Sequence, residues 1–237
     1  MSGINLLGIT KSFTVDEKNI PVLQGLNLFI PEKKITVLLG KSGCGKTTIL
    51  RLIANLESKD SGTIDHEDTL RTAFVFQEPR LMPWLNVQKN VEFGLKKDEI
   101  NKEETDSLIF MVGLLSFKKA YPAQLSGGMK QRVAIARALA YKPDFIMMDE
   151  PFAALDSFTR EQMQKELIKL QTLNAMSILF VTHSIDEALL LGDKITIIEN
   201  GTVKSEFEIE EGKEKRNILS DYFLKLRTQI MMRLENT

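Results

Sequence analysis

The sequence predicts an α/β fold with a mostly parallel sheet, an N-terminal antiparallel β part and an inserted helical subdomain. Three observations support this prediction. Short apolar runs alternate with helical segments through much of the chain, which is typical of parallel strands covered by helices. The part before residue 77 is rich in strands and turns, whereas residues 78–142 show helical spacing. A glycine-rich loop joins a strand to a helix near residue 40.

The apolar pattern predicts the individual elements in order. Before residue 77 we expect strands at 4–9 and 22–30 with a polar loop at 14–19 between them, a turn at 31–34, a buried strand at 35–39, a turn at 61–62 and a strand at 73–76. Beyond it we expect helices at 86–95, 101–115, 129–140, 157–173 and 185–191, and strands at 145–148, 177–181, 195–198 and 202–207. The last two strands flank Asn200-Gly201, a strong hairpin signal.

The tail differs from the rest of the chain. Residues 206–216 are highly charged, and apolar residues then recur at helical spacing from Ile218 to Leu234. We expect a C-terminal helix that packs on the domain, with a regulatory or dimerising helix as the alternative. The predicted organisation is therefore one domain over residues 1–205, with its helical subdomain at about 78–142, and a C-terminal segment over 206–237.

Composition excludes several classes of protein. Of the 237 residues, 43% are hydrophobic, which is enough for a sizeable core, and the formal net charge is −1. This balance argues against binding driven by bulk charge, so we expect no nucleic-acid partner. One cysteine and two histidines predict neither an intrachain disulfide nor a metal cluster. The first ten residues lack signal-peptide character and no apolar run approaches the length of a membrane span, so we expect neither feature.

The glycine-rich loop matches the phosphate-binding pattern G-x-x-x-x-G-K-[ST], with a strand before it and a helix after it. Its residues are Gly40, Lys41, Ser42, Gly43, Cys44, Gly45, Lys46 and Thr47, and Thr48 follows in the helix. Such a backbone can wrap a polyphosphate, and the helix N-terminus adds its positive dipole end. Lys46 would bridge the β- and γ-phosphates, and the Thr47 hydroxyl would hold Mg²⁺. The alternative is an ordinary glycine turn.

Polar residues stand at the ends of three further predicted strands, where open α/β sheets bind ligands. Asp149 could hold the Mg²⁺ shell, and Glu150 could polarise a water for attack on the γ-phosphate. His183 is a candidate to contact the γ-phosphate, and Gln77 could sense Mg²⁺ or the attacking water. Taken singly, each of these residues could have a structural role instead.

A second possible anion-binding helix start lies far along the chain. Ser126 can cap the helix that follows, and Gly127 and Gly128 leave its N–H groups bare. One nucleotide needs no second such start, so a simple capped helix is the alternative.

Together these motifs resemble the ATP-binding subunits of ABC transporters, and the resemblance covers nearly the whole chain. It identifies four motifs: Walker A at residues 40–47, the signature at 125–129, Walker B at 145–149 and the D-loop at 154–156. It also implies the roles of four single residues: Gln77 as the Q-loop residue, Glu150 as the catalytic base, His183 as the switch histidine and Phe13 as the aromatic residue that stacks on adenine.

The resemblance also implies partners. Two ATP-binding subunits would pair head to tail, so that Ser126, Gly127 and Gly128 of one contact the γ-phosphate held by the other, with Asp156 of the D-loop also at the nucleotide. Two transmembrane permease subunits and, indirectly, an extracytoplasmic substrate-binding protein would complete the assembly. The chain would lie peripherally on the cytoplasmic side of the membrane.

Some residues depart from the family pattern, and others resemble one subfamily of importers. Met129 replaces the usual signature glutamine, and Lys33 and Asn55 stand where glycine is common. Phe13 could equally be a core residue. Residues 75–84 and 125–132 resemble importers of nitrate, sulfonate and taurine, some of whose relatives import pyrimidine vitamin precursors. In this family the region of Trp84 receives a coupling helix of the permease; the alternative is an ordinary core or surface tryptophan.

The sequence therefore predicts an ATPase that powers import of a small solute. A soluble ABC ATPase of DNA repair or translation is a weaker alternative, because such proteins carry tandem cassettes, long insertions or basic segments. A protein that binds ATP without hydrolysing it is a third, against which the intact Lys46, Asp149, Glu150 and His183 argue.

Overall fold

The computed structural model describes residues 2–65 and 70–235. Its centre is a six-stranded sheet in the order β5-β6-β7-β3-β8-β9, in which only the β8–β9 pair is antiparallel. The strands are β3 (Ile35–Leu39), β5 (Thr72–Val75), β6 (Phe145–Asp149), β7 (Ser177–Thr182), β8 (Lys194–Glu199) and β9 (Thr202–Glu208). The predicted mostly parallel sheet is confirmed.

The central strands are buried on both faces, which explains why they are apolar runs and not alternating patterns. Successive residues of β3 contribute to different hydrophobic clusters: Val37 and Leu39 pack with the helices of one face, and Leu38 packs on the other. β6 alternates in the same way, with Ile146 on the first side and Met147 on the second.

A second, antiparallel sheet has the order β2-β1-β4 and is formed by β1 (Gly3–Val15), β2 (Lys18–Pro31) and β4 (Ser61–Asp65). The polar loop expected at residues 14–19 is wrong. Ladder pairing continues to Val15 opposite Lys18, and the chain reverses through Asp16 and Glu17 alone. Both residues have positive φ, 46° and 63°, as a tight hairpin turn requires. Polar composition concealed the hairpin because this part of the ladder is exposed to solvent.

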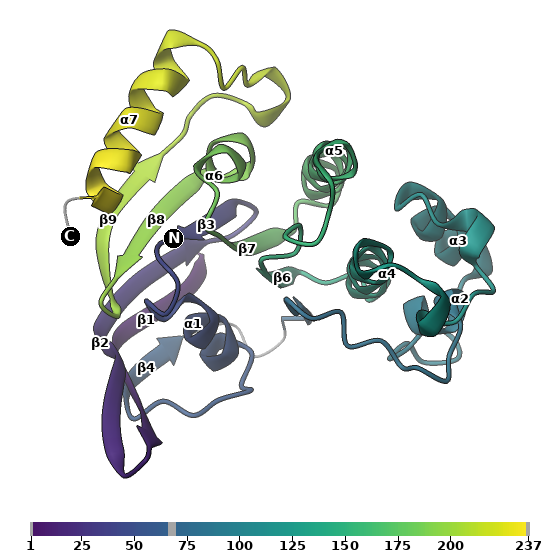
Figure 1. Ribbon diagram of the computed structural model, residues 1–237, viewed down its shortest axis with the longest axis horizontal. Coiled ribbons are helices and arrows are strands. Elements are labelled where there is room, and N and C mark those ends of the chain that lie inside the picture. The colour runs from purple at the N-terminus through teal and green to yellow at the C-terminus, as the bar shows by residue number, and fades with distance from the viewer. Residues whose placement is uncertain (1, 66–69, 236–237) are drawn as a thin grey trace.

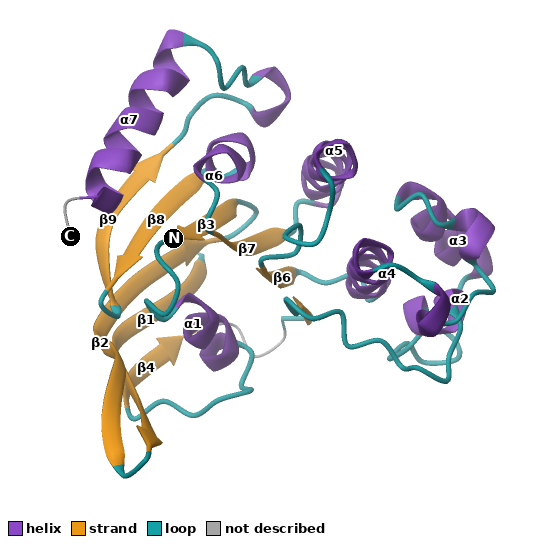
Figure 2. Ribbon diagram, in the orientation of Figure 1, coloured by secondary structure: helices purple, strands orange, loops and turns teal. Residues whose placement is uncertain are grey.

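Helices cover the six-stranded sheet and form a separate layer at one end (Figures 1 and 2). In Figure 1, α2, α3 and α4 gather at the end of the molecule farthest from β1, β2 and β4. The helices are α1 (Lys46–Ile53), α2 (Val87–Val91), α3 (Lys102–Met111), α4 (Gly127–Ala140), α5 (Ser157–Asn174), α6 (Ile185–Leu191) and α7 (Asp221–Glu235).

α2 and α3 are shorter than the predicted helices at 86–95 and 101–115. Each is followed within three residues by a glycine, Gly94 or Gly113, with φ of 96° or 68°, which ends the helical path. α4 starts two residues before the predicted Met129, because Ser126 caps it and accepts a hydrogen bond from the Met129 N–H at 3.2 Å.

Two departures from the family pattern have a backbone explanation. Lys33 and Asn55 replace common glycines, and both have left-handed backbone, with φ of 58° and 54°. Glycine adopts this region without strain, whereas Asn does so more readily than Lys. The structure therefore tolerates these residues by accepting strain at two turns outside the phosphate loop.

The tail returns to the domain through α7. Phe223, Leu226 and Ile230 of α7 are buried in the core cluster that includes α6. Arg216 donates to the carbonyls of Leu189, Leu190 and Gly192 at the end of α6, at 3.0, 3.1 and 2.7 Å. Within the described residues, no helix is both long and apolar enough to cross a membrane.

Candidate nucleotide-binding site

The phosphate loop joins β3 to α1 and is shaped by glycines. Gly45 is the N-cap of α1 and has φ of 104°. A Cβ atom there would lie 2.7 Å from Leu23 Cδ2, and a Cβ atom at Gly40 would lie 2.4 Å from the Ile198 carbonyl oxygen. Both positions thus require glycine, which brings the loop close to β2 and β8 and leaves N–H groups at the helix start.

Lys46 lies inside this loop and is only 6% exposed. Its Nζ donates to the carbonyls of Gly40 and Lys41, each at 2.8 Å, and lies 3.6 Å from Cys44 Sγ. An ammonium group in a loop of backbone N–H donors is suited to a polyphosphate, since every donor can turn to an anionic oxygen.

Thr47 and Asp149 meet beside the loop. The Thr47 hydroxyl donates to Asp149 Oδ1 at 3.1 Å. Burial raises the pKa of the Asp149 carboxyl, and the hydrogen bond from Thr47 acts in the opposite direction. A buried carboxylate beside a hydroxyl provides the hard oxygen ligands that Mg²⁺ prefers, so this donor set fits the ion.

Glu150 and His183 are brought together because β6 and β7 are adjacent and parallel. Glu150 Oε2 lies 3.2 Å from His183 Nδ1, and the Glu150 N–H donates to the Val181 carbonyl at 3.0 Å. Glu150 has φ of 45°, in the left-handed region that a side chain rarely adopts. Backbone strain of this kind occurs at functional sites as well as in turns such as those of Lys33 and Asn55.

Gln77 and Asp156 occupy loops at the same edge of the sheet. Gln77 follows β5, and the preceding Phe76 carbonyl accepts a hydrogen bond from Gln131 Nε2 of α4 at 3.0 Å. Asp156 caps α5 by accepting from the Thr159 N–H at 3.0 Å, and hydrogen bonds from Thr159 lower its pKa.

The start of α4 does not join the phosphate loop on the same chain. Ser126 and Gly127 are exposed, and a Cβ atom at Gly128 would lie 3.0 Å from the Ala154 carbonyl oxygen. Gly128 therefore approaches the loop before α5. In Figure 1, α4 and α1 lie far apart.

Phe13 lies on β1 opposite Ile20, within the hairpin that the sequence did not predict. Its ring is half-buried, and Lys11 Nζ lies 4.9 Å from the ring centroid. It belongs to neither hydrophobic cluster of the described residues, which argues against the core alternative. Stacking on adenine stays a prediction.

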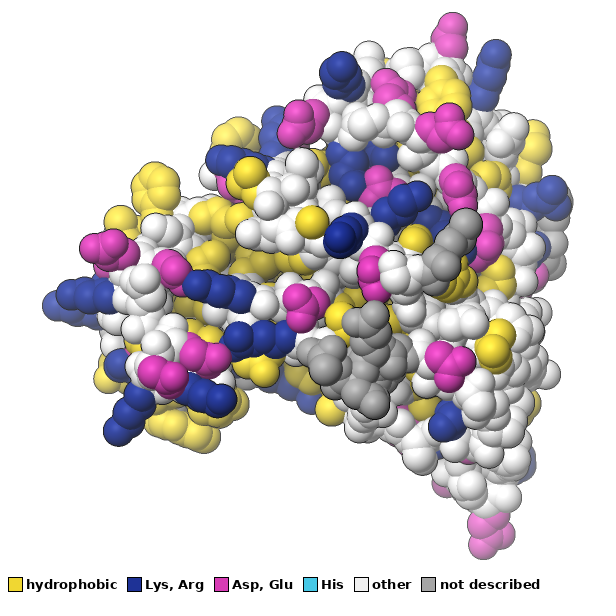
Figure 3. All heavy atoms as spheres, turned by 180° about the vertical axis from the view of Figure 1, so that it is seen from behind, with side chains coloured by type: hydrophobic (Ala, Val, Ile, Leu, Met, Phe, Trp, Pro, Cys, Tyr) yellow, Lys and Arg dark blue, Asp and Glu magenta, His cyan; other side chains and the backbone are white. Residues whose placement is uncertain are grey.

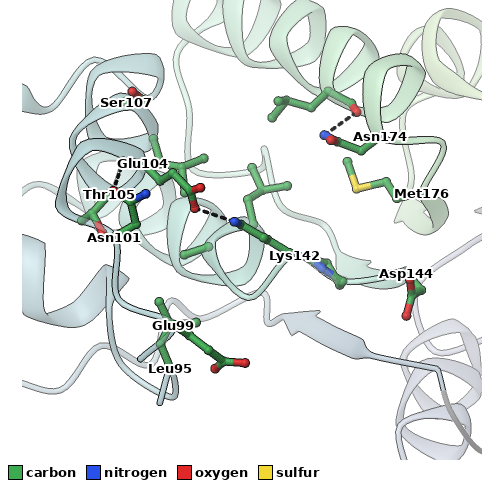
Figure 4. Close-up of a pocket in the computed structure, with 15 residues that line it drawn as sticks. Leu95, Glu99, Asn101, Glu104, Thr105, Ser107, Lys142, Asp144, Asn174 and Met176 are labelled. Carbon is green, nitrogen blue, oxygen red and sulfur yellow. Dashed lines mark hydrogen bonds and ion pairs between the residues drawn. The ribbon is translucent and has the colours of Figure 1, made fainter. Parts of the chain in front are cut away.

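Cavities surround this edge and also occur far from it. A hollow of about 400 Å³ opens beside the phosphate loop, between Lys41–Cys44, Val22 and Leu234. A larger cavity of about 600 Å³ lies between α3 and the ends of α4 and α5, where the Lys142–Glu104 ion pair spans it at 2.6 Å (Figure 4). It lies at the start of β6, away from the carboxyl ends of the strands, so this larger cavity is not the phosphate site.

The polar residues around His183 were not predicted from the sequence. A hollow of about 80 Å³ is lined by Glu150, His183, Thr182, Arg160 and Glu187, among others. Arg160 and Glu187 lie on different helices, α5 and α6, and carry no motif of their own. Glu187 lies four residues after His183, in the first turn of α6, and only this spacing could have drawn attention to it.

Comparisons with known proteins agree with this geometry. A family model described as ABC transporter matches residues 23–153. An uncharacterized ABC transporter ATP-binding protein of Methanocaldococcus jannaschii is 41% identical over 94% of this chain and 88% of its own length. The aliphatic sulfonates import ATP-binding protein of Bacillus cereus is 36% identical over 98% and 96%, and that of Bacillus subtilis is 42% identical over 80% and 77%.

Solved structures extend the agreement to the fold. A dimeric ATP-binding cassette in a post-hydrolysis state bound to ADP and Pi has a TM-score of 0.80 and 33% identity, over 88% of this chain and 99% of its own. A second dimeric structure, of a bacterial ABC transporter cassette, has a TM-score of 0.80 and 34% identity over the same shares. The chain therefore belongs to the ATP-binding subunits of ABC transporters, and it is an ATPase whose activity is coupled to transport.

Proposed function

We propose that this chain hydrolyses ATP with Mg²⁺ to power uptake of a small organic or inorganic anion of the sulfonate type. The observation that supports hydrolysis best is the Glu150–His183 pair, 3.2 Å apart at the strand ends beside Thr47 and Asp149. The names of the sulfonate importers among its relatives support the substrate class.

Each residue of the site has a distinct task in this proposal. Lys46 Nζ would exchange the carbonyls of Gly40 and Lys41 for oxygens of the β- and γ-phosphates. Mg²⁺, held by Thr47 and Asp149 with Gln77 near its shell, would neutralise charge on the phosphate oxygens.

Glu150 would act as general base. Its Oε2 is engaged by His183 Nδ1, which leaves Oε1 to accept a hydrogen bond, and then the proton, from the attacking water. His183 would hold the carboxylate in this orientation by donating from Nδ1, and a ring that is also protonated at Nε2 would donate from there to the γ-phosphate. Both tasks require the histidine to be fixed relative to β6.

We assign the start of α4 to the nucleotide of a second copy in a head-to-tail homodimer. Ser126 and Gly127 are exposed, and the first N–H groups of α4 lack partners within the helix. The dimeric cassettes with which this chain aligns support the pairing. Asp156, at the neighbouring loop, would also lie at the interface.

The helical region is proposed to dock on two membrane permease subunits at the cytoplasmic side of the membrane. Trp84 is 69% exposed and Phe110 is 70% exposed, so Trp84 is not a core residue. The same region exposes further large apolar side chains: Phe93, Ile100, Leu115, Phe117 and Tyr121. Apolar side chains lie over this end of the molecule in Figure 3, where acidic and basic groups are interspersed. An extracytoplasmic substrate-binding protein would deliver the anion.

Reconstitution tests the proposal. The chain is assembled in vesicles with its permease and binding protein, and uptake of a radiolabelled alkanesulfonate is measured with and without ATP. We expect ATP-dependent uptake that the Glu150→Gln variant lacks. Uptake of a pyrimidine in place of the sulfonate would contradict the substrate class and leave the ATPase assignment intact. Absence of phosphate release by the wild-type chain would contradict the ATPase assignment itself.

A further inference from the structure

A partly buried polar network lies behind His183 and has no task in the proposed chemistry. Its centre is Glu187, whose side chain is 12% exposed. Glu187 Oε2 accepts a hydrogen bond from the Thr182 hydroxyl at 2.5 Å, and Oε1 accepts one from Gln164 Nε2 at 3.3 Å. Arg160 Nε lies 3.9 Å from the same Oε1, an ion pair without a hydrogen bond. The carboxylate thus joins β7 to α5 next to the histidine.

Thr182 carries this network to His183. Its hydroxyl accepts a hydrogen bond from the Ser184 N–H at 3.0 Å, which closes a turn with His183 at its apex. A hydroxyl can donate one hydrogen bond, and Thr182 donates it to the Glu187 carboxylate. Because Thr182 is only 2% exposed, loss of the Glu187 acceptor would leave this hydroxyl to compete for other partners, and the turn would loosen.

The arrangement differs from an ordinary helix cap. Ser184 caps α6 and accepts from the Glu187 N–H at 3.3 Å, as the first half of a capping box. In the second half the glutamate would accept from the Ser184 N–H, but here the Thr182 hydroxyl takes that N–H. The glutamate bonds to the strand end instead, so its side chain serves the His183 turn.

The other end of the network reaches the loop before α5. Arg160 Nη2 donates to the Leu155 carbonyl at 2.9 Å, and Leu155 precedes Asp156, the cap of α5. The same loop meets Gly128 of α4. Glu187 therefore stands between the loop at residues 154–156 and the turn that carries His183.

We propose that Glu187 is a positioning residue for hydrolysis: through Thr182 it holds the His183 turn, and through Arg160 it ties that turn to the loop at residues 154–156. This inference rests on the proposed role of His183. Since Glu187 touches neither nucleotide nor water in the proposed site, its loss should reduce kcat and leave the KM for ATP nearly unchanged.

Phosphate release by the full chain tests this proposal with a double-mutant cycle. Glu187→Ala should lower kcat about tenfold, with KM within about twofold of wild type. In a His183→Ala background the same change should lower kcat less than about twofold, because the residue through which it acts is gone. The control is Glu161→Ala on α5, whose carboxylate pairs with Lys165 in solvent at 2.6 Å and should change nothing.

Thr182 provides a second, gentler test should Glu187→Ala fail to fold. Thr182→Val removes the hydroxyl and should reproduce the loss of kcat, whereas Thr182→Ser retains the hydroxyl and should remain within about twofold of wild type. Equal losses in both backgrounds, or activities equal to the Glu161→Ala control, would overturn the proposal. A His183→Ala chain with full activity would contradict the role of His183 itself, which separates the two failures.

Discussion

The phosphate loop leads into α1, and both α1 and α4 begin with an N-terminus suited to anions. The two helix starts differ in the side chains that their own chain places around them. Around the phosphate loop, Lys46, the adjacent pair Asp149 and Glu150, and His183 come from three segments to one edge of the sheet. The start of α4 instead contacts the loop before α5 at Ala154, and Ser126 is exposed. In the proposed assembly, the first region binds a triphosphate on its own chain, whereas the second meets a nucleotide held by another copy. On this proposal, binding and hydrolysis of ATP depend on different residues and should be separable by mutation.

Removing the base should separate them most strongly. Glutamine is nearly isosteric with glutamate but cannot act as a general base, so Glu150→Gln should lower hydrolysis about 10²–10⁴-fold while ATP binding persists. The uncleaved ATP should hold two subunits together as a dimer. Phosphate release and size-exclusion chromatography with ATP measure the two effects. Hydrolysis near the wild-type rate would show that Glu150 is not the base.

Mixing two inactive chains should show that the two regions work in trans. Lys46→Ala disables the loop and Ser126→Arg blocks the helix start, so neither variant alone should hydrolyse ATP. An equimolar mixture contains heterodimers with one intact composite site, and it should recover up to about a quarter of wild-type activity. A mixture as inactive as its components would refute the trans arrangement. The control is Lys46→Ala alone at the same total protein concentration.

A third test asks how far the loop depends on close packing. Gly45→Ala places a Cβ atom 2.7 Å from Leu23 Cδ2 at φ 104°, so it should lower the unfolding free energy by about 1–3 kcal/mol and weaken ATP binding. Gly94→Ala is a matched control: φ is 96°, but no atom lies within 4 Å. It should show only the backbone penalty. Equal losses in denaturant titrations would mean that packing against Leu23 contributes little.

The smallest effect concerns Asp149 in the ligand-free chain. Burial raises its pKa in the folded state, so the folded chain binds more protons than the unfolded one above the ordinary pKa. The contribution of Asp149 to stability therefore falls as the pH rises from its ordinary pKa to the raised pKa of the folded state. Asp149→Asn should raise the melting temperature slightly at pH 7, with each kcal/mol worth about 2–4 °C, and the gain should shrink toward pH 4. A gain that grows on acidification would contradict this sign.

Local patterns were sufficient for much of the fold. The buried strands at 145–149 and 177–182 were predicted within a residue because a strand covered on both faces is apolar throughout. The hairpin at Asp16–Glu17 was missed, because its ladder is exposed and its composition is that of a loop. The lengths of α2 and α3 were overestimated, since the glycines that follow them outweigh the apolar spacing.

The phosphate loop could be recognised from local sequence alone. Its glycines, Lys46 and Thr47 are adjacent in the chain, so their spacing already specifies strand, loop and helix. Which distant residues meet there follows from the way the chain folds. The order of β6 and β7 sets Glu150 against His183, and packing of α5 and α6 brings Arg160 and Glu187 behind them. The reason is physical: a motif records contacts between neighbours along the chain, whereas strand order and helix packing arise from burial of the whole core.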